Sequence, residues 1–284
     1  ETLNFSRTAE LLHMTQPAVS QQMNSLEAYY GVRLFSNKRK GMQLTEEGQL
    51  LLEYATDLNR ISQSLKAQLQ SNENRVRTYS IGATMTIGGY VLPRILGQYK
   101  EAHPMTDVKL TVENTEKVIG QIRNGDLILG LVEGPFPKGK FYSNLLRNDE
   151  LVIAVSPQHP LAKKDSVSME TLLAYPLILR EEGSGTRNVF EKAVRASGFS
   201  KSQINVHMEI GNIHALVSLV ESNLGATVIS RDAISESLKR GSLKQVQVSG
   251  VRIEREYRFV YLDDRIPFID EFIVFCKKAY KNNL

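Results

Sequence analysis

Two short runs of hydroxyl and glycine residues hold the side chains best suited to binding chemistry, and each lies where a strand-like segment gives way to a helix-like one. They are Thr84, Met85 and Thr86 in the first run, and Ser184, Gly185, Thr186 and Arg187 in the second. Unpaired N–H groups at a helix N-terminus carry partial positive charge and stabilise an anion. The pattern predicts a small-anion site, although ordinary N-capping by Ser and Thr accounts for the same residues.

The sequence lacks the motifs of common enzyme sites. Gly183-Ser184-Gly185 is not the Gly-x-Ser-x-Gly elbow of hydrolases, because its glycines are too close together. Asn188 stands where a dinucleotide-binding loop needs its third glycine, and no Gly-Lys-Ser/Thr ending marks a P-loop. The histidines form no His-Glu-x-x-His pair and have no cysteine partner nearby. We therefore expect no catalysis, no metal and no cofactor.

Composition sets broad limits on the class of protein. The 284 residues are enough for two or three domains, and 42% hydrophobic with 23% charged residues is an ordinary globular mixture. No window approaches the ~20 apolar residues of a membrane helix, so we expect no membrane partner. The single cysteine, Cys276, excludes an internal disulfide and fits a cytoplasmic location. Because the chain begins at Glu1, we expect its natural first residues to be missing.

The N-terminal segment predicts two short helices joined by a tight turn. Residues 5–12 carry apolar side chains at helical spacing, and a second helix begins after Thr15, with Pro17 in its first turn. This arrangement is typical of a helix-turn-helix. The second helix presents short polar and amide side chains that can bond base edges or phosphates: Thr15, Gln16, Ser20, Gln21 and Asn24. A merely solvated polar face is the alternative.

Two further features follow before the polar boundary at 71–75. Residues 32–35 and 42–45 predict two short strands around a basic tip, a wing whose Lys38, Arg39 and Lys40 would lie against the DNA backbone. Thr45 then caps a helix that runs to about Asn72. Its apolar stripe is too narrow for one helix to bury, and consists of Leu51, Ala55, Leu58, Leu65 and Leu69. We expect this helix to pair with a second copy; packing onto its own C-terminal domain is the alternative.

From Thr78 onwards, strand-like and helix-like segments alternate, which predicts parallel sheets with helices on both faces, arranged as two α/β lobes. The expected strands are 79–82, 108–112, 127–132, 151–155, 177–179, 206–209, 227–229, 243–248 and 257–262. Expected helices include 89–101, 116–123, 186–197 and 213–222.

Four blocks in a fixed order resemble the LysR-type transcriptional regulator family. They are Thr15-Gln16-Pro17-Ala18-Val19-Ser20, then Leu26-Glu27, then Gly31-Val32-Arg33-Leu34-Phe35, and then Leu44-Thr45-Glu46-Glu47-Gly48. The resemblance covers the whole chain and implies an α/β protein with three parts. These are an all-α winged helix-turn-helix (1–45), a linker helix (46–75) and a two-lobed effector domain similar to periplasmic binding proteins (76–284). The lobes would comprise 78–156 with 257–284, and 157–256, joined by strands that cross near 155–156 and 256–257.

The resemblance also implies partners and site residues. The partners would be a double-stranded DNA operator, a small anionic metabolite or oxyanion between the lobes, further copies in a homodimer or homotetramer, and RNA polymerase if the protein activates transcription. The expected DNA contacts are Thr15, Gln16, Pro17, Ser20, Gln21, Asn24, Arg33, Lys38, Arg39, Lys40 and Thr45. The expected effector contacts are Thr84, Met85, Thr86, Gly134, Ser184, Gly185, Thr186, Arg187, Gly211 and Asn212.

The chain departs from the family pattern in two places. Gln21 stands where members usually have arginine, and most of the helix that usually precedes Phe5 is absent. The run from Thr84 to Pro93 and the Gly-Ser-Gly-Thr-Arg motif are similar to a branch of sulfur-assimilation and carbon-fixation regulators. The alternative function is a small-anion-binding module without specific DNA readout.

Overall fold

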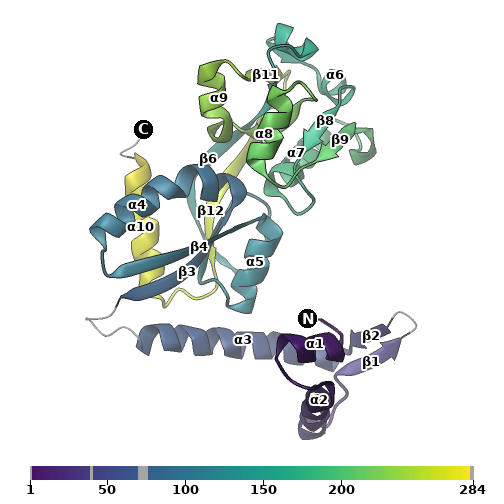
Figure 1. Cartoon of the computed structure of the whole chain (residues 1–284), viewed down its shortest axis with the longest axis vertical. Helices are drawn as coiled ribbons and strands as arrows, with labels where there is room; N and C mark the ends of the chain where they lie inside the picture. Colours follow the sequence, from purple (N-terminus) through teal and green to yellow (C-terminus); the bar gives the residue numbers. More distant parts are fainter. Residues whose placement is uncertain (1, 39–40, 70–75, 282–284) are drawn as a thin grey trace. The chain divides into compact units, whose positions relative to one another are not determined.

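A computed structural model describes residues 2–38, 41–69 and 76–281. The chain divides into two compact units, residues 1–63 and residues 64–284 (Figure 1). Among the described residues, no helix is both long and apolar enough to cross a membrane.

The smaller unit opens with the helix-turn-helix that the sequence predicts. Helix α1 (Phe5–Leu11) is followed closely by α2 (Gln16–Tyr30). Thr15 caps α2, because its hydroxyl accepts the N–H of Ala18 at 3.4 Å. Gly31 ends the helix in the left-handed conformation at φ 68°, which glycine adopts without strain.

A two-stranded wing follows, but its first strand starts later than predicted. Strands β1 (Phe35–Lys38) and β2 (Gly41–Leu44) pair in antiparallel fashion. The expected strand at 32–35 is therefore wrong for all but its last residue. The Glu27 carboxylate accepts the N–H of Leu34 at 2.7 Å, so this N–H bonds to a side chain on α2 and not to a neighbouring strand.

Glu27 thus ties the end of α2 to the start of the wing. Besides Leu34, it accepts Nη1 of Arg33 at 3.0 Å, and its side chain is only 12% exposed. The hydrogen bond from the Leu34 backbone, helped by Arg33, holds the pKa of the Glu27 carboxyl below its ordinary value despite the opposing effect of burial.

The long helix α3 (Glu46–Leu69) begins at Thr45, as expected. The Thr45 hydroxyl accepts the N–H of Gly48 at 2.9 Å and donates to the carbonyl of Arg33 at 2.6 Å. The predicted end at Asn72 lies outside the described residues. The large hydrophobic side chains described as exposed on α3 are Leu50, Tyr54, Leu58, Ile61 and Leu65. Of the expected stripe, Ala55, Leu58 and Leu65 are exposed, Leu51 is partly buried, and the side chain of Leu69 lies outside the described residues.

The larger unit alternates strands and helices. Its strands are β3 (Arg77–Thr84), β4 (Thr106–Glu113), β5 (Leu129–Val132), β6 (Tyr142–Val155), β7 (Ser166–Val167), β8 (Leu177–Leu179), β9 (Val206–Glu209), β10 (Thr227–Ser230), β11 (Lys244–Val248) and β12 (Ile253–Tyr261). Its helices are α4 (Leu92–Ala102), α5 (Thr115–Asn124), α6 (Met169–Leu173), α7 (Gly185–Ala196), α8 (Ile213–Glu221), α9 (Ser235–Arg240) and α10 (Pro267–Lys281). A π-helical turn, η1 (Ile87–Val91), precedes α4, and short 3-10 turns are η2 (Lys138–Lys140), η3 (Pro160–Lys163), η4 (Lys201–Gln203) and η5 (Asp232–Ile234).

The main sheet is mixed, which corrects the expectation of parallel sheets. Its order is β4-β3-β5-β12-β6-β11-β7, and β10 also pairs with β6. Strand β3 is parallel to β4 and β5, and β8 is parallel to β9. The partners of β6 and β12 in this sheet are all antiparallel, because these two long strands run in opposite directions through both lobes (Figure 1).

Strands β6 and β12 connect two separate hydrophobic cores. The lobe 1 core contains Tyr257 and Phe259 of β12 together with side chains of α4 and α10, while α5 covers the other face of this part of the sheet. The lobe 2 core contains Ile253 of β12 and Leu151 of β6. Helices on both faces are therefore confirmed for lobe 1.

One expected crossing point is wrong. Residues 151–155 of β6 already pair with β10 and β11 inside lobe 2, so β6 leaves lobe 1 several residues before the expected 155–156. The crossing of β12 near Glu256-Tyr257 agrees with the expectation, since Tyr257 belongs to the lobe 1 core. The hydrophobic run at 151–155 marks the buried part of β6 and not its beginning.

Replacing Glu27 by Gln should lower the free energy of unfolding of the smaller unit by about 1–3 kcal/mol at neutral pH, the contribution of hydrogen bonds to a charged acceptor. A carboxyl whose pKa is lowered by folding stabilises the folded state at pH values above its unfolded pKa of about 4.3. This stabilisation is lost as the pH falls through the pKa that the carboxyl has in the folded state. The difference between wild type and variant should therefore shrink in acid. Chemical denaturation at several pH values measures it, with Glu10→Gln on exposed α1 as control; equal stabilities at neutral pH would contradict the role.

Candidate functional site

The two hydroxyl runs predicted from the sequence meet at one buried guanidinium. Arg255 of β12 donates from Nη1 to the Thr186 hydroxyl at 2.8 Å and from Nη2 to the Thr86 hydroxyl at 3.3 Å. Thr86 precedes η1 in lobe 1, and Thr186 lies in the first turn of α7 in lobe 2. Arg255 therefore joins both lobes from the strand that crosses between them. All three residues are buried.

The charge of Arg255 is balanced within the same pair of crossing strands. Its Nε donates to Oδ2 of Asp149 at 2.6 Å, and the two residues are opposite each other in the register of β6 and β12. The second Asp149 oxygen accepts the Ser230 hydroxyl at 2.8 Å. A buried carboxylate with both oxygens bonded holds the guanidinium in one orientation, so the positions of Thr86 and Thr186 follow from this pair.

A second acidic residue, Glu133, lies beside Arg255 but is poorly bonded. Its Oε1 is 3.5 Å from Nη1 of Arg255, its Oε2 has no hydrogen-bond partner, and its side chain is 3% exposed. Burial raises the pKa of the Glu133 carboxyl, and the opposing charges of Arg255 and Arg180 do not reverse the shift. The hydroxyl of Thr115, at the start of α5, is also buried without a partner.

Two glycines allow the lobes to touch near these groups. A Cβ added to Gly134 would lie 2.7 Å from Cα of Gly185, and one added to Gly185 would lie 3.0 Å from the carbonyl oxygen of Glu133. Both added atoms would also lie 2.8 Å from the Thr115 hydroxyl. The start of α7 in lobe 2 thus packs directly on the lobe 1 backbone that follows β5. We call this region the interlobe seam: Thr86, Thr115, Glu133, Gly134, Ser184, Gly185, Thr186 and Arg255.

Other predicted effector residues lie near the interlobe seam. Thr84 is buried in lobe 1, and its hydroxyl donates to the carbonyl of Leu131 at 3.4 Å. Met85 comes from lobe 1 but packs against a hydrophobic cluster of lobe 2. Ser184 is the N-cap residue of α7, yet its buried hydroxyl makes no capping bond.

Two predicted residues, Arg187 and Asn212, have other partners in the structure. The guanidinium of Arg187 is bonded to Glu191 at 2.9 Å and to Glu209, so it belongs to an ion network within lobe 2. This arrangement does not support the expected role for Arg187, because the cation between the two hydroxyl runs is Arg255. Asn212 caps α8 by accepting the N–H of Ala215 at 3.0 Å, and its neighbour Gly211 is exposed.

Arg255, Asp149 and Glu133 were not predicted from the sequence. Arg255 had a usable signal: in β12 the side chains of Ile253, Arg255 and Tyr257 alternate with exposed ones and share a buried face. A charged residue at an inward strand position needs a buried partner, which marks a candidate site. Asp149 and Glu133 carry no comparable pattern, because only the paired register of distant strands brings them to Arg255.

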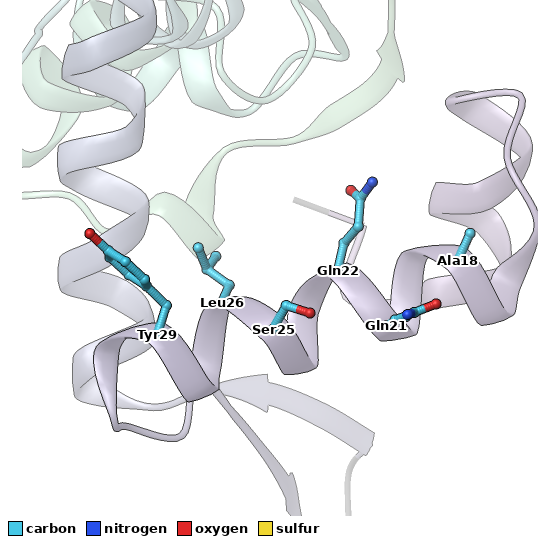
Figure 2. Close-up of a pocket in the computed structure, with 6 residues that line it drawn as sticks. All are labelled: Ala18, Gln21, Gln22, Ser25, Leu26 and Tyr29. Atoms are coloured by element: carbon cyan, nitrogen blue, oxygen red, sulfur yellow. The ribbon is translucent and has the colours of Figure 1, made fainter.

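The outer surface of α2 carries the predicted DNA contacts. Thr15, Gln16, Pro17, Gln21 and Asn24 are exposed, and Ser20 is partly so. A shallow hollow along this face is lined by Gln16, Pro17, Ser20, Gln21, Asn24, Ser25 and Ala28. A second one, shown in Figure 2, is lined by Ala18, Gln21, Gln22, Ser25, Leu26 and Tyr29.

The predicted wing contacts are only partly described. Arg33 is 83% exposed in its side chain and pairs with Glu27. Arg39, Lys40 and the side chain of Lys38 lie outside the described part of the chain. No group of three or more potential metal ligands occurs among the described residues.

Comparison with known proteins gives consistent matches at both ends of the chain. Residues 1–49 match the family model "Bacterial regulatory helix-turn-helix protein, lysR family", and residues 72–281 match "LysR substrate binding domain". A probable RuBisCO transcriptional regulator of Cyanidium caldarium is 31% identical over 256 residues, covering 89% of this chain and 81% of the relative. An uncharacterised helix-turn-helix transcriptional regulator of Methanocaldococcus jannaschii is 32% identical over 267 residues, covering 92% and 88%.

Solved structures share the fold at lower identity. The regulatory domain of Synechocystis CcmR, in complex with 2-PG, is 23% identical with a TM-score of 0.66, covering 72% of this chain and 98% of that one. A full-length OxyR variant from Pseudomonas aeruginosa is 23% identical with a TM-score of 0.63, covering 96% and 94%. At this identity the structures support the fold of the two parts.

Replacing Asp149 by Asn should lower the free energy of unfolding of the larger unit by about 3–5 kcal/mol, because Arg255 would lose its buried counter-charge. The control is Glu254→Gln on the same strand, where an exposed pair with Arg252 contributes about 1 kcal/mol or less. Denaturant unfolding of both variants measures the difference. Equal, small losses in the two variants would show that the Asp149–Arg255 pair does not hold the crossing strands.

Proposed function

We propose, for a chain that belongs to the LysR family of DNA-binding transcriptional regulators, that a small anionic metabolite binds at the interlobe seam and controls the contact with DNA. The observation that carries the proposal is the pair of hydroxyls, Thr86 and Thr186, held by Arg255 across the two lobes. Both hydroxyl oxygens accept from the guanidinium, so each O–H can donate to another acceptor, which for Thr86 is the Glu133 side chain in this structure. Hydroxyl donors at the start of α7 suit an oxyanion.

The proposed chemical class of the effector is supported by what similar proteins bind and regulate. The related CcmR domain was solved with 2-PG, which we take as 2-phosphoglycolate, and several relatives are named probable regulators of RuBisCO. We propose a metabolite with phosphate or carboxylate groups for this chain too. The candidate contacts are Thr84, Met85, Thr86, Gly134, Ser184, Gly185 and Thr186, with Arg255 in place of Arg187 as the organising cation. Gly211 and Asn212 remain candidates for effector contacts at the edge of the interlobe seam.

Effector binding requires the lobes to part, because Thr86 and Thr186 are only 1% and 4% exposed. Both the parted and the closed arrangement must keep β6 and β12 continuous, so lobe 2 moves by deforming these strands. An effector that bonds to both lobes favours one arrangement over the other and shifts the population accordingly. We propose that this shift alters how two copies present their α2 helices to DNA.

Helix α2 is the proposed reading element. Its exposed face carries Gln16, Ser20, Gln21 and Asn24, whose amide and hydroxyl groups suit base edges in the major groove. Thr15, Pro17 and Thr45 would lie against the backbone with Arg33 and the basic residues 38–40 of the wing. Gln21 lacks the charge of the arginine usual in the family, so this position reads DNA through its amide.

Helix α3 is the proposed pairing element. Its exposed stripe of Leu50, Tyr54, Leu58, Ile61 and Leu65 repeats at spacings of four, four, three and four residues. Such a stripe faces one side of a helix and fits a second copy of the same helix. We propose a homodimer through α3, with assembly into a homotetramer, a cytoplasmic location, and contact with RNA polymerase where the protein activates transcription.

Replacing Gln21 by Ala should weaken binding to the operator by about 10- to 100-fold, since one good base contact contributes about 1–3 kcal/mol. Gln49→Ala, which removes an exposed amide from α3, is the matched control and should bind normally. Fluorescence anisotropy with operator and scrambled DNA separates specific from general affinity. If Gln21→Ala, Gln16→Ala and Ser20→Ala all kept wild-type affinity for the operator, the proposal that α2 contacts the DNA bases would be contradicted.

Adding 2-phosphoglycolate to the full chain at 100 times its dissociation constant should raise the unfolding midpoint of the larger unit. The expected rise is about 5–10 °C, since ligand binding adds about 2.7 kcal/mol and each kcal/mol is worth about 2–4 °C at this size. Sulfate, phosphate and uncharged glycolamide complete the panel. Thr186→Ala should lose the ligand-induced rise and the exposed control Thr78→Ala should keep it. A rise with the uncharged compound alone would contradict an anionic effector.

A further inference from the structure

Glu133 is the acidic group of the interlobe seam whose hydrogen-bonding capacity is only partly used, with Thr86 as its side-chain hydrogen-bond partner. Its side chain is 3% exposed, and Oε2 has no partner. Oε1 reaches only one cation, at 3.5 Å, and that Arg255 guanidinium already bonds to Asp149, Thr86 and Thr186. A buried carboxylate normally has several strong donors around it. The surroundings of Glu133 therefore suit a neutral carboxylic acid, which has one proton to donate.

The groups facing Glu133 come from both lobes and both crossing strands. They are Arg255 and Tyr257 from β12, Asp149 from β6, Arg180 from the end of β8 and Thr86 before η1. Arg180 is engaged with the neighbouring Glu181 through two hydrogen bonds, at 2.8 and 2.9 Å. Arg255 is already paired with Asp149. Arg180 and Arg255 therefore each have another carboxylate partner, and neither balances the charge of Glu133 fully.

Other unused donors lie around the same backbone. The Thr115 hydroxyl is buried without a partner, and it lies at the meeting point of Gly134 and Gly185. The Ser184 hydroxyl is 2% exposed and makes no capping bond. Lobe 1 thus has two buried polar side chains with an unpartnered atom, Glu133 and Thr115, and the start of α7 from lobe 2 packs on the backbone between them at Gly134.

We infer, resting on the function proposed above, that Glu133 is an effector ligand that binds the anion as a carboxylic acid, donating its O–H to an effector oxygen. When the free carboxyl is ionised, binding takes one proton from solvent onto the carboxylate. No bond to the effector forms or breaks apart from hydrogen bonds. Anion and proton therefore bind together, and the acid distinguishes an anionic effector, which accepts the bond, from a cationic one, which offers no acceptor.

The consequence for pH is directional. Below the pKa of free Glu133 the carboxyl is already protonated, and effector affinity does not depend on this group. Above it, affinity should fall by about tenfold per pH unit, because each binding event must take up one proton. A phosphate effector titrates near pH 6 as well, so the informative quantity is the difference between wild type and a variant that cannot titrate at position 133.

Isothermal titration of the full chain with 2-phosphoglycolate, from about pH 6 to pH 9 and in buffers of different ionisation enthalpy, measures this difference. Glu133→Gln keeps a donor without a titratable proton. It should bind with near wild-type affinity at low pH, lose about one proton of uptake, and exceed wild type by tenfold or more at high pH. Glu133→Ala should bind weakly at all pH values, and exposed Glu101→Gln should behave as wild type. If affinity depended on pH in the same way in wild type and Glu133→Gln, the inference about Glu133 would be overturned and the proposed effector would be unaffected. If no anion of the panel bound to wild type, both the inference and the proposed function would be overturned.

Infrared difference spectroscopy between the effector-free and the effector-bound chain tests the same residue independently. In the effector complex, wild type should show the carbonyl band of a protonated carboxyl. The band should be absent from Glu133→Gln and present in Glu101→Gln. A wild-type complex without the band would show that Glu133 meets the effector as a carboxylate, which would overturn the inference.

Discussion

The ion pair between Asp149 and Arg255 is the interaction on which the arrangement of the larger unit depends. It lies where β6 and β12 cross between the lobes, and the two residues are register partners. Burying two charges is costly unless they are well bonded, and here Ser230, Thr86 and Thr186 supply the additional hydrogen bonds. Because the two threonines belong to different lobes, the same bonds that satisfy the guanidinium also fix where the lobes meet.

The chemistry of the interlobe seam follows from this pair. Arg255 is held by its own counter-charge, Asp149, and it orients the hydroxyls of Thr86 and Thr186. Glycines at 134 and 185 then bring a helix start of one lobe against the backbone of the other, which a methyl group would prevent. Among the described residues, the seam therefore combines hydroxyl groups and the start of α7 with a cation whose charge is already balanced.

Local patterns in the sequence predicted much of the architecture. The Thr15 cap, the Thr45 cap and the alternation of segments after Thr78 depend on neighbours a few residues apart, and the structure has them. The first wing strand was misplaced because Glu27, seven residues away, takes the Leu34 N–H. Arg187 was favoured over Arg255 because the motif around it is contiguous, whereas Arg255 gains its place through pairing with a strand about a hundred residues earlier. Helix caps and turns can be predicted from residue types a few positions apart. A buried charge network cannot, because the tertiary fold brings its residues together from distant parts of the chain.

The continuous pairing of β6 with β12 has a mechanical consequence. The two strands stay hydrogen-bonded from Ile253 opposite Leu151 to Tyr261 opposite Tyr142, so they form one antiparallel ribbon with a single irregularity between Tyr257 and Arg258. An irregularity of this kind bends the strand and increases the local twist. The paired stretch between the lobes therefore carries its greatest twist beside Tyr257, close to the point where β12 passes from one lobe to the other.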